Sequence, residues 1–152
     1  MSWLVTGGAG YIGSHVADAF LRVGFEVVVI DDLSTGKKSF IPEGAAFVEG
    51  GVEDSALLDD AFGKHSIDGV IHLAGFKFAG ESVKNPLVAY NANTTATVSL
   101  LHAMVNHGVK ALVFSSSCSV YGDTGDAQVD ESFPLNPASP YGVVSSCFCR
   151  RG

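Results

Sequence analysis

The stretch Thr6-Gly7-Gly8-Ala9-Gly10-Tyr11-Ile12-Gly13 decides the fold of this chain of 152 residues. It follows a short run of strand-forming residues at 3–6, opens a segment with helical spacing, and matches both G-x-G-x-x-G and T-G-x-x-G-x-x-G. Residues without a Cβ let a pyrophosphate approach the backbone N–H groups at a helix N-terminus, and the last glycine lets the helix lie close to the sheet. The turn therefore predicts dinucleotide binding; a glycine turn that only packs a helix tightly is the alternative. The residues predicted to hold the ligand are Gly7, Gly10, Tyr11, Ile12 and Gly13.

An acidic residue lies at a suitable distance from this turn. A second β-branched run ends at Asp31, 18 residues after Gly13, where a carboxylate can accept hydrogen bonds from both adenosine ribose hydroxyls. The same carboxylate repels a 2′-phosphate, so the sequence predicts NAD rather than NADP; a solvated acid at a strand end is the alternative. The next turn is predicted to lie beside the adenosine, unless it is an ordinary connecting loop: Asp32, Leu33, Ser34, Thr35 and Gly36.

Short β-branched runs alternate with helical segments along the chain. The predicted strands cover residues 3–6, 26–30, 46–48, 69–73 and 111–115. A first helix is predicted from an apolar stripe that ends before Gly24: Ile12, Val16, Phe20 and Val23. A second is predicted after a cap at Asp54 or Ser55, from Leu57, Leu58, Ala61 and Phe62. A third, longer helix is predicted with Asn85 as N-cap, Pro86 at its first position and Gly108 just past its end. This alternation predicts an α/β fold with a parallel sheet and helices on both faces. A further helix is expected to begin at Tyr141, after a proline-rich loop.

Composition excludes several classes of partner. The chain carries 9 Lys and Arg against 16 Asp and Glu, a net charge of −7, so we expect neither nucleic acid nor a membrane surface as partner. It contains no apolar run of transmembrane length and no cleavable leader pattern, which predicts a cytoplasmic protein. Three cysteines without metal-ligand spacing predict reduced thiols and no metal site.

Five motifs in the correct order resemble the extended short-chain dehydrogenase/reductases and, among them, the UDP-glucose 4-epimerases. They are TGGAGYIGSH at residues 6–15, DDLSTG at 31–36, HLAGFKFAGESV at 72–83, FSSSCSVYGD at 114–123 and SPYG at 139–142. The third motif discriminates best, because related nucleotide-sugar dehydratases usually carry a different stretch there. The resemblance extends through Gly142 and implies a Rossmann-type doubly wound sheet with strand order 3-2-1-4-5, truncated before the last strands and the substrate domain.

The resemblance also implies further cofactor contacts. The residues after the fourth predicted strand line the cofactor: Leu73, Ala74, Gly75, Phe76 and Lys77. From the residues alone, Lys77 is as readily a solvated loop lysine. Asn93, or its neighbour Ala92, matches a position near the cofactor. Gly51 and Val52 match residues beside the adenine, where the family commonly has an aspartate at the first position; Gly51 leaves only backbone contact, so we expect weaker adenine recognition.

The mechanism implied by the resemblance interconverts UDP-glucose and UDP-galactose. A tyrosine phenolate, matched by Tyr141, takes the proton from the sugar 4-hydroxyl while NAD takes the hydride from C4, and the 4-keto sugar turns over and receives the hydride on its other face. Ser117 matches the hydroxyl that bridges tyrosine and sugar. The family's lysine four residues after the tyrosine is replaced by Ser145, and no lysine follows Lys110. A hydroxyl cannot supply the positive charge that stabilises a phenolate.

The last residues depart from the family's pattern. Residues 144–152, Val-Ser-Ser-Cys-Phe-Cys-Arg-Arg-Gly, read as an atypical tail that is possibly out of frame, after an incomplete NAD-binding domain at 1–143. We expect the chain to be an N-terminal fragment of an epimerase, inactive alone, and a homodimer by resemblance only. The alternatives are a non-catalytic NAD-binding module and another nucleotide-sugar epimerase, reductase or decarboxylase.

Overall fold

A computed structural model describes residues 1–149 of the chain, which form two compact units. The first comprises residues 1–74 and 96–115 and is called the sheet unit; the second comprises residues 75–95 and those from Ser116 onward and is called the helical unit. The described residues include no helix long and apolar enough to cross a membrane. Residues 150–152, the end of the predicted tail, lie outside the described residues.

The sheet unit is built on five parallel strands. They are β1 (Ser2–Thr6), β2 (Glu26–Asp31), β3 (Ala46–Glu49), β4 (Ile67–His72) and β5 (Ala111–Phe114). Their order is β3-β2-β1-β4-β5, which confirms the predicted Rossmann-type topology. Thr6 is in register with Ile30 on one side and with His72 on the other. The loops that follow β1, β2 and β4 therefore start at the same edge of the sheet, where open parallel sheets bind ligands.

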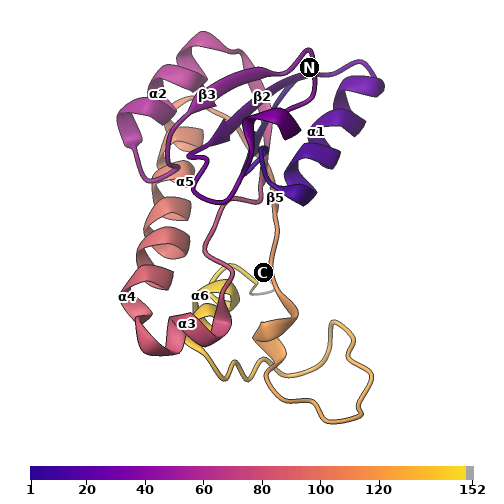
Figure 1. Cartoon of the computed structure of the whole chain (residues 1–152), viewed down its shortest axis with the longest axis vertical. Helices are drawn as coiled ribbons and strands as arrows, with labels where there is room; N and C mark the ends of the chain where they lie inside the picture. The colour runs from indigo at the N-terminus through magenta and orange to yellow at the C-terminus, as the bar shows by residue number, and fades with distance from the viewer. Residues whose placement is uncertain (150–152) are drawn as a thin grey trace. The chain divides into compact units, whose positions relative to one another are not determined.

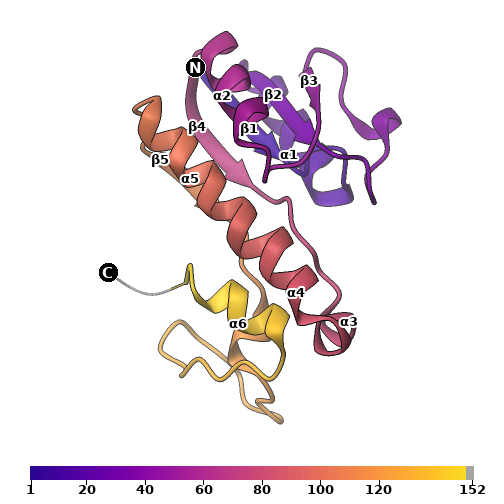
Figure 2. The same cartoon turned by 90° about the vertical axis from the view of Figure 1, so that its left-hand side faces the viewer.

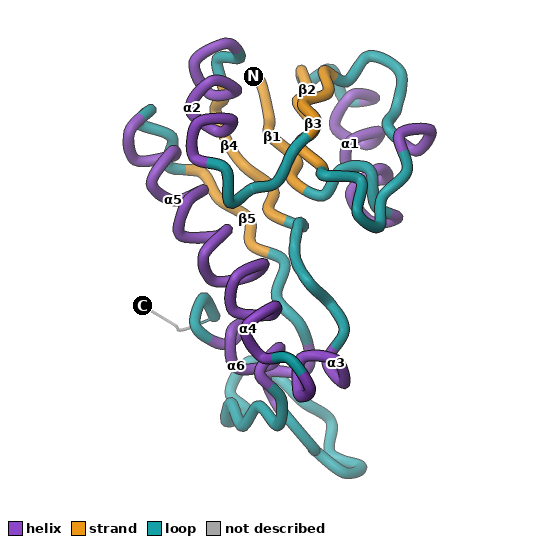
Figure 3. Tube along the Cα trace, turned by 60° about the vertical axis from the view of Figure 1, so that its left-hand side comes forward, coloured by secondary structure: helices purple, strands orange, loops and turns teal. Residues whose placement is uncertain are grey.

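Helices cover both faces of this sheet, as predicted (Figures 1 and 3). The unit contains α1 (Tyr11–Arg22), the short 3₁₀ helix η1 (Lys38–Phe40), α2 (Ser55–Lys64) and α5 (Ala96–Asn106). Leu4 and Val28 pack with the buried residues of α2 and α5 on one face, whereas Val5 and Val29 pack with α1 on the other. Successive strand residues thus pack into the cores on opposite faces of the sheet, which explains why the strand sequences are continuously apolar.

The boundaries of α1 and α2 follow the predicted signals, but the apolar stripe predicted for α1 is wrong at its ends. Gly24 follows the C-cap with a φ of +87°, and the Asp54 carboxylate caps α2 by accepting from two backbone N–H groups. Ile12 and Val23 are exposed, while Gly13 and Ala17 are buried against the sheet. Small residues allow α1 to approach the strands closely, so its contact face is set by the absence of side-chain bulk.

The helical unit consists of short elements. They are α3 (Ala79–Lys84), α4 (Pro86–Ala89), the π-helical η2 (Tyr90–Thr95), the 3₁₀ helix η3 (Cys118–Tyr121) and α6 (Pro140–Ser146). The long helix predicted after Asn85 is thus α-helical at its start, π-helical over Tyr90–Thr95, and α-helical again as α5. The helix α6 begins at Pro140, one residue before the predicted Tyr141, and packs against α3, α4 and η3 (Figure 2). All three cysteines are free thiols.

Candidate functional site

The glycine turn after β1 is closed around its own backbone. The Gly7 N–H donates to the Ile30 carbonyl at 2.8 Å, and the Gly10 N–H donates to the Gly7 carbonyl at 3.1 Å. Gly7 has a φ of +71°, and a Cβ on it would lie 2.8 Å from the Ala74 nitrogen. A Cβ on Gly13 would collide with the Gly7 carbonyl oxygen. These two glycines are therefore required by the close approach of backbone to backbone.

The N-terminus of α1 is open to an anion. Among the described residues no side chain caps it, and its first turn contains no acidic residue. The N–H groups of Tyr11 and Ile12 lie in the first turn, where no helical carbonyl four residues earlier can accept from them, and both side chains are exposed. A Cβ on Gly10 would meet only the Gly7 carbonyl, at 3.2 Å, so the turn stays open on that side. Free donors at the positive end of a twelve-residue helix fit the pyrophosphate that the sequence predicts.

Asp31 connects the glycine turn to the turn after β2. One of its carboxylate oxygens accepts from the Ala9 N–H at 2.9 Å, and the other accepts from the Leu33 N–H at 2.8 Å. A Cβ on Gly36 would lie 2.8 Å from the second oxygen, which explains a glycine there. Each carboxylate oxygen can accept more than one hydrogen bond, so Asp31 retains capacity for a ribose hydroxyl. The geometry fits the role predicted for Asp31.

Hydrogen bonds also fix the rest of this turn and connect Asp31 to the loop after β3. Asp32 folds back on Ser34, accepting from its N–H at 2.9 Å and its hydroxyl at 2.6 Å, and Thr35 is exposed. The Gly50 N–H donates to the Asp31 carbonyl at 3.1 Å, which fixes the loop containing Gly51 and Val52. Val52 is buried in the core. A Cβ on Gly51 would meet only the end of the flexible Glu53 side chain, so steric crowding alone does not demand this glycine.

A buried histidine that the sequence analysis did not single out supports the loop after β4. His72 is 2% exposed and lies between the hydroxyls of Thr6, 2.7 Å from Nδ1, and Thr97, 3.0 Å from Nε2. The Thr6 hydroxyl oxygen accepts from the Leu73 and Ala74 N–H groups at 3.2 Å each, so its own proton points to Nδ1. His72 is then neutral with its proton on Nε2, and burial lowers its pKa from 6.5 to about 4.

In the helical unit, Asn93 holds the backbone of Phe76. Its side-chain oxygen accepts from the Phe76 N–H at 2.7 Å, and its side-chain nitrogen donates to the Phe76 carbonyl at 3.0 Å. A Cβ on Gly75 would lie 2.7 Å from that same oxygen. Asn93 therefore fixes the segment predicted to line the cofactor, and its amide is directed to protein backbone. The Lys77 ammonium lies 5.9 Å from the centre of the Phe78 ring.

The helical unit brings the segments of Ser117 and Tyr141 together. The Ser117 hydroxyl accepts from the Ser119 N–H at 3.2 Å at the start of η3. A Cβ on Gly142, next to Tyr141, would lie 2.6 Å from the Ser119 carbonyl oxygen, so the two backbones touch there. Ser145, four residues after Tyr141, donates its hydroxyl proton to the Tyr141 carbonyl at 2.9 Å. The position of the family's lysine is thus filled by a group bonded to backbone.

Comparison with known proteins identifies the family of the chain. A family model described as NAD dependent epimerase/dehydratase family matches residues 3–147, and the chain belongs to this family. Among its curated relatives are the UDP-glucose 4-epimerases of Streptomyces lividans, 45% identical over 142 residues, and of Bacillus subtilis, 44% identical over 149 residues. Each alignment covers 93% of this chain but only 43% and 44% of the relatives, respectively.

Solved structures of UDP-glucose 4-epimerases also resemble the chain in fold. A crystal structure of a UDP-glucose 4-epimerase superimposes with a TM-score of 0.94 at 37% identity, covering 97% of this chain and 45% of that one. The UDP-glucose 4-epimerase of Brucella ovis, solved in complex with NAD, gives a TM-score of 0.92 at 39% identity, covering 96% and 45%. The chain therefore spans less than half the length of the relatives it matches.

Proposed function

We propose that this chain is the NAD-binding part of an epimerase that interconverts UDP-glucose and UDP-galactose. The observation that carries the proposal is the Asp31 carboxylate, which bonds the glycine turn at Ala9 beside the uncapped N-terminus of α1. A carboxylate and free helix N–H groups at one sheet edge suit a ribose and a pyrophosphate, respectively. The similarity to UDP-glucose 4-epimerases supports the substrate, and the cited Brucella ovis complex supports NAD.

The main predicted residues receive the following roles in this proposal. The N–H groups at the start of α1 bind the pyrophosphate, Asp31 binds the adenosine ribose, and the loops at 51–52 and 73–77 line the cofactor. Bound NAD would supply the hydride acceptor for C4 of the sugar. Tyr141 would take the proton of the 4-hydroxyl, and Ser117 would bridge the two hydroxyls. We propose residues 1–143 as the domain that carries these roles.

A second function, a non-catalytic NAD-binding module, is favoured by Ser145. A phenol ionises near pH 10 in water, so a tyrosine base depends on a nearby cation to work near neutral pH. The group four residues after Tyr141 is instead a neutral hydroxyl already bonded to the Tyr141 carbonyl. If no other cation serves Tyr141, the chain binds NAD without turning over the sugar.

Two measurements separate these functions. Calorimetric titration with NAD tests binding, with Asp31→Ala as the variant expected to lose affinity and Asp126→Ala, an exposed acid in a loop, as the charge-matched control. A coupled assay of UDP-galactose conversion tests turnover. Saturable binding with turnover supports the epimerase, and binding alone supports the module. Absence of NAD binding by the folded chain would refute both.

We further propose that the protein is cytoplasmic and acts as a homodimer on a UDP-sugar. The similarity to UDP-glucose 4-epimerases supports this proposal. Light scattering coupled to gel filtration measures the oligomeric state: a mass near 15.8 kDa in solution would exclude the dimer for this chain.

A further inference from the structure

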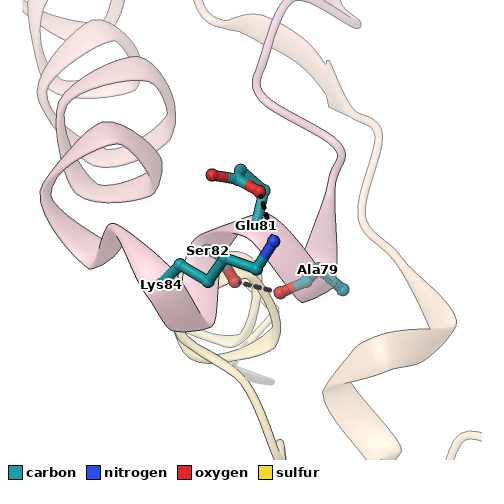
Figure 4. Close-up of polar contacts among 4 residues, drawn as sticks. All are labelled: Ala79, Glu81, Ser82 and Lys84. Atoms are coloured by element: carbon teal, nitrogen blue, oxygen red, sulfur yellow. Dashed lines mark hydrogen bonds and ion pairs between the residues drawn. The ribbon is translucent and has the colours of Figure 1, made fainter.

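Ser82 is a buried hydroxyl within the most discriminating sequence motif, and none of the roles above uses it. It lies in α3 and is completely buried. Its Oγ donates to the Ala79 carbonyl at 2.6 Å, while its neighbours Glu81 and Lys84 form an exposed ion pair at 3.3 Å (Figure 4). The helix thus presents one polar group to the interior and an ion pair to solvent. The buried hydroxyl needs an explanation, because a serine gains little from burial as such.

The explanation lies in a hydrogen bond to α6. The Tyr141 backbone N–H donates to the Ser82 Oγ at 3.1 Å, across 59 residues of sequence. Because the Ser82 proton is already directed to the Ala79 carbonyl, the lone pairs of the oxygen are available to accept. Ser82 therefore joins the first turn of α3 to the backbone of the tyrosine proposed as proton acceptor.

The other donors in the first turn of α6 are satisfied locally. Pro140 has no N–H, the Gly142 N–H donates to the Ser139 Oγ at 3.2 Å, and the Val143 N–H donates to the Ser139 carbonyl at 2.9 Å. Tyr141 alone has no acceptor within its own segment, since the first N–H groups of a helix lack intrahelical partners. Its backbone is consequently held by a residue from another part of the helical unit.

We propose that Ser82 is a positioning residue for Tyr141, and this rests on the proposed function only in naming Tyr141 as the proton acceptor. Ser82 fixes the backbone from which the phenol projects. On the other side, Gly142 lies against the Ser119 carbonyl, in the turn that Ser117 begins. The start of α6 is therefore held between α3 and the Ser117 turn, and a loss of either contact leaves the direction of the Tyr141 ring less defined.

Amide hydrogen exchange measured by NMR tests the hydrogen bond directly. We expect Ser82→Ala to raise exchange at the Tyr141 N–H by about tenfold, the size typical of one lost hydrogen bond, while the Gly142 N–H held by Ser139 stays within about twofold. Glu81→Gln is the matched control and leaves both amides unchanged. Unaltered exchange at Tyr141 in Ser82→Ala, or an equal rise along all of α3 and α6, would overturn the proposal.

A second measurement follows the tyrosine ring itself. In protein labelled with 3-fluorotyrosine, the ¹⁹F signal of residue 141, assigned with Tyr141→Phe, is expected to shift in Ser82→Ala and Ser82→Val but to return toward its original position in Ser82→Thr. Threonine and valine have the same shape, so rescue by threonine alone assigns the effect to the hydroxyl. Equal shifts of the ¹⁹F signal in Ser82→Val and Ser82→Thr would refute the proposal. Neither readout requires NAD binding or turnover, so a failure of the proposed function leaves this test intact.

Discussion

Lowering the pH should remove a defined part of the free energy of unfolding through His72. Burial lowers the pKa of this imidazole from 6.5 to about 4, because the charged form would lose its hydration between two threonine hydroxyls and the core. The unfolded chain therefore binds a proton between these pH values that the folded chain does not. Stability from His72 is complete above about pH 6.5, falls as the pH drops below it, and is lost below about pH 4.

The magnitude follows from the shift. A shift of that size corresponds to roughly 3 kcal/mol of unfolding free energy, at about 1.4 kcal/mol per pKa unit. Urea unfolding followed by the fluorescence of Trp3, the chain's single tryptophan, measures it at a series of pH values. His72→Gln serves as reference: we expect it to be less stable at neutral pH, but its stability lacks the component that titrates with His72.

The decisive quantity is the difference between the two pH profiles, since carboxylates titrate in both proteins. We expect the wild type to lose roughly 3 kcal/mol more than His72→Gln between about pH 7 and about pH 4. Parallel profiles would show that His72 takes up its second imidazole proton over the same pH range in the folded and the unfolded chain, and would refute the lowered pKa. Nitrogen-15 NMR of the imidazole tests separately whether His72 is neutral and protonated on Nε2 between Thr6 and Thr97, because the two ring nitrogens have different shifts when only one is protonated.

Substitutions at three positions of the site, with two control substitutions outside it, test the proposed roles further. Gly13→Ala forces a Cβ against a carbonyl of the glycine turn, so we expect calorimetry to show a loss of NAD binding and urea unfolding to show a free energy of unfolding lower by about 2 kcal/mol or more. Gly63→Ala is the control in α2: its Cβ meets no described atom within 4 Å, so we expect it to raise the free energy of unfolding by up to about 1 kcal/mol. Asp31→Asn should weaken NAD binding by about tenfold or more in titration, because a charge-assisted acceptor becomes neutral, and unchanged affinity would remove Asp31 from the site. Ser145→Lys should raise UDP-galactose turnover above that of the wild type in the coupled assay, while Ser146→Lys should not; equal rates in both would disprove the need for a cation at position 145.

Much of the sheet unit could be predicted because its signals are local. A glycine turn followed by a helical segment needs only a few neighbouring residues to fix backbone conformation, and Asp31 ends the next strand. The helix caps at Asp54 and Gly24 were predictable for the same reason. The buried face of α1 could not be predicted in this way. A search for apolar stripes finds large apolar residues, whereas this helix contacts the sheet through Gly13 and Ala17.

The sequence by itself determined the class of fold, the position of the proposed cofactor turn and the candidates Ser117 and Tyr141. Only the tertiary structure decided what holds these residues in place. His72 bonds Thr6 across 66 residues of sequence, and Ser82 bonds Tyr141 across 59. Periodicity and capping describe residues a few positions apart, so they cannot register such pairs. A serine or histidine becomes a support only when packing buries it beside an unsatisfied backbone or hydroxyl group, and that depends on the folded chain.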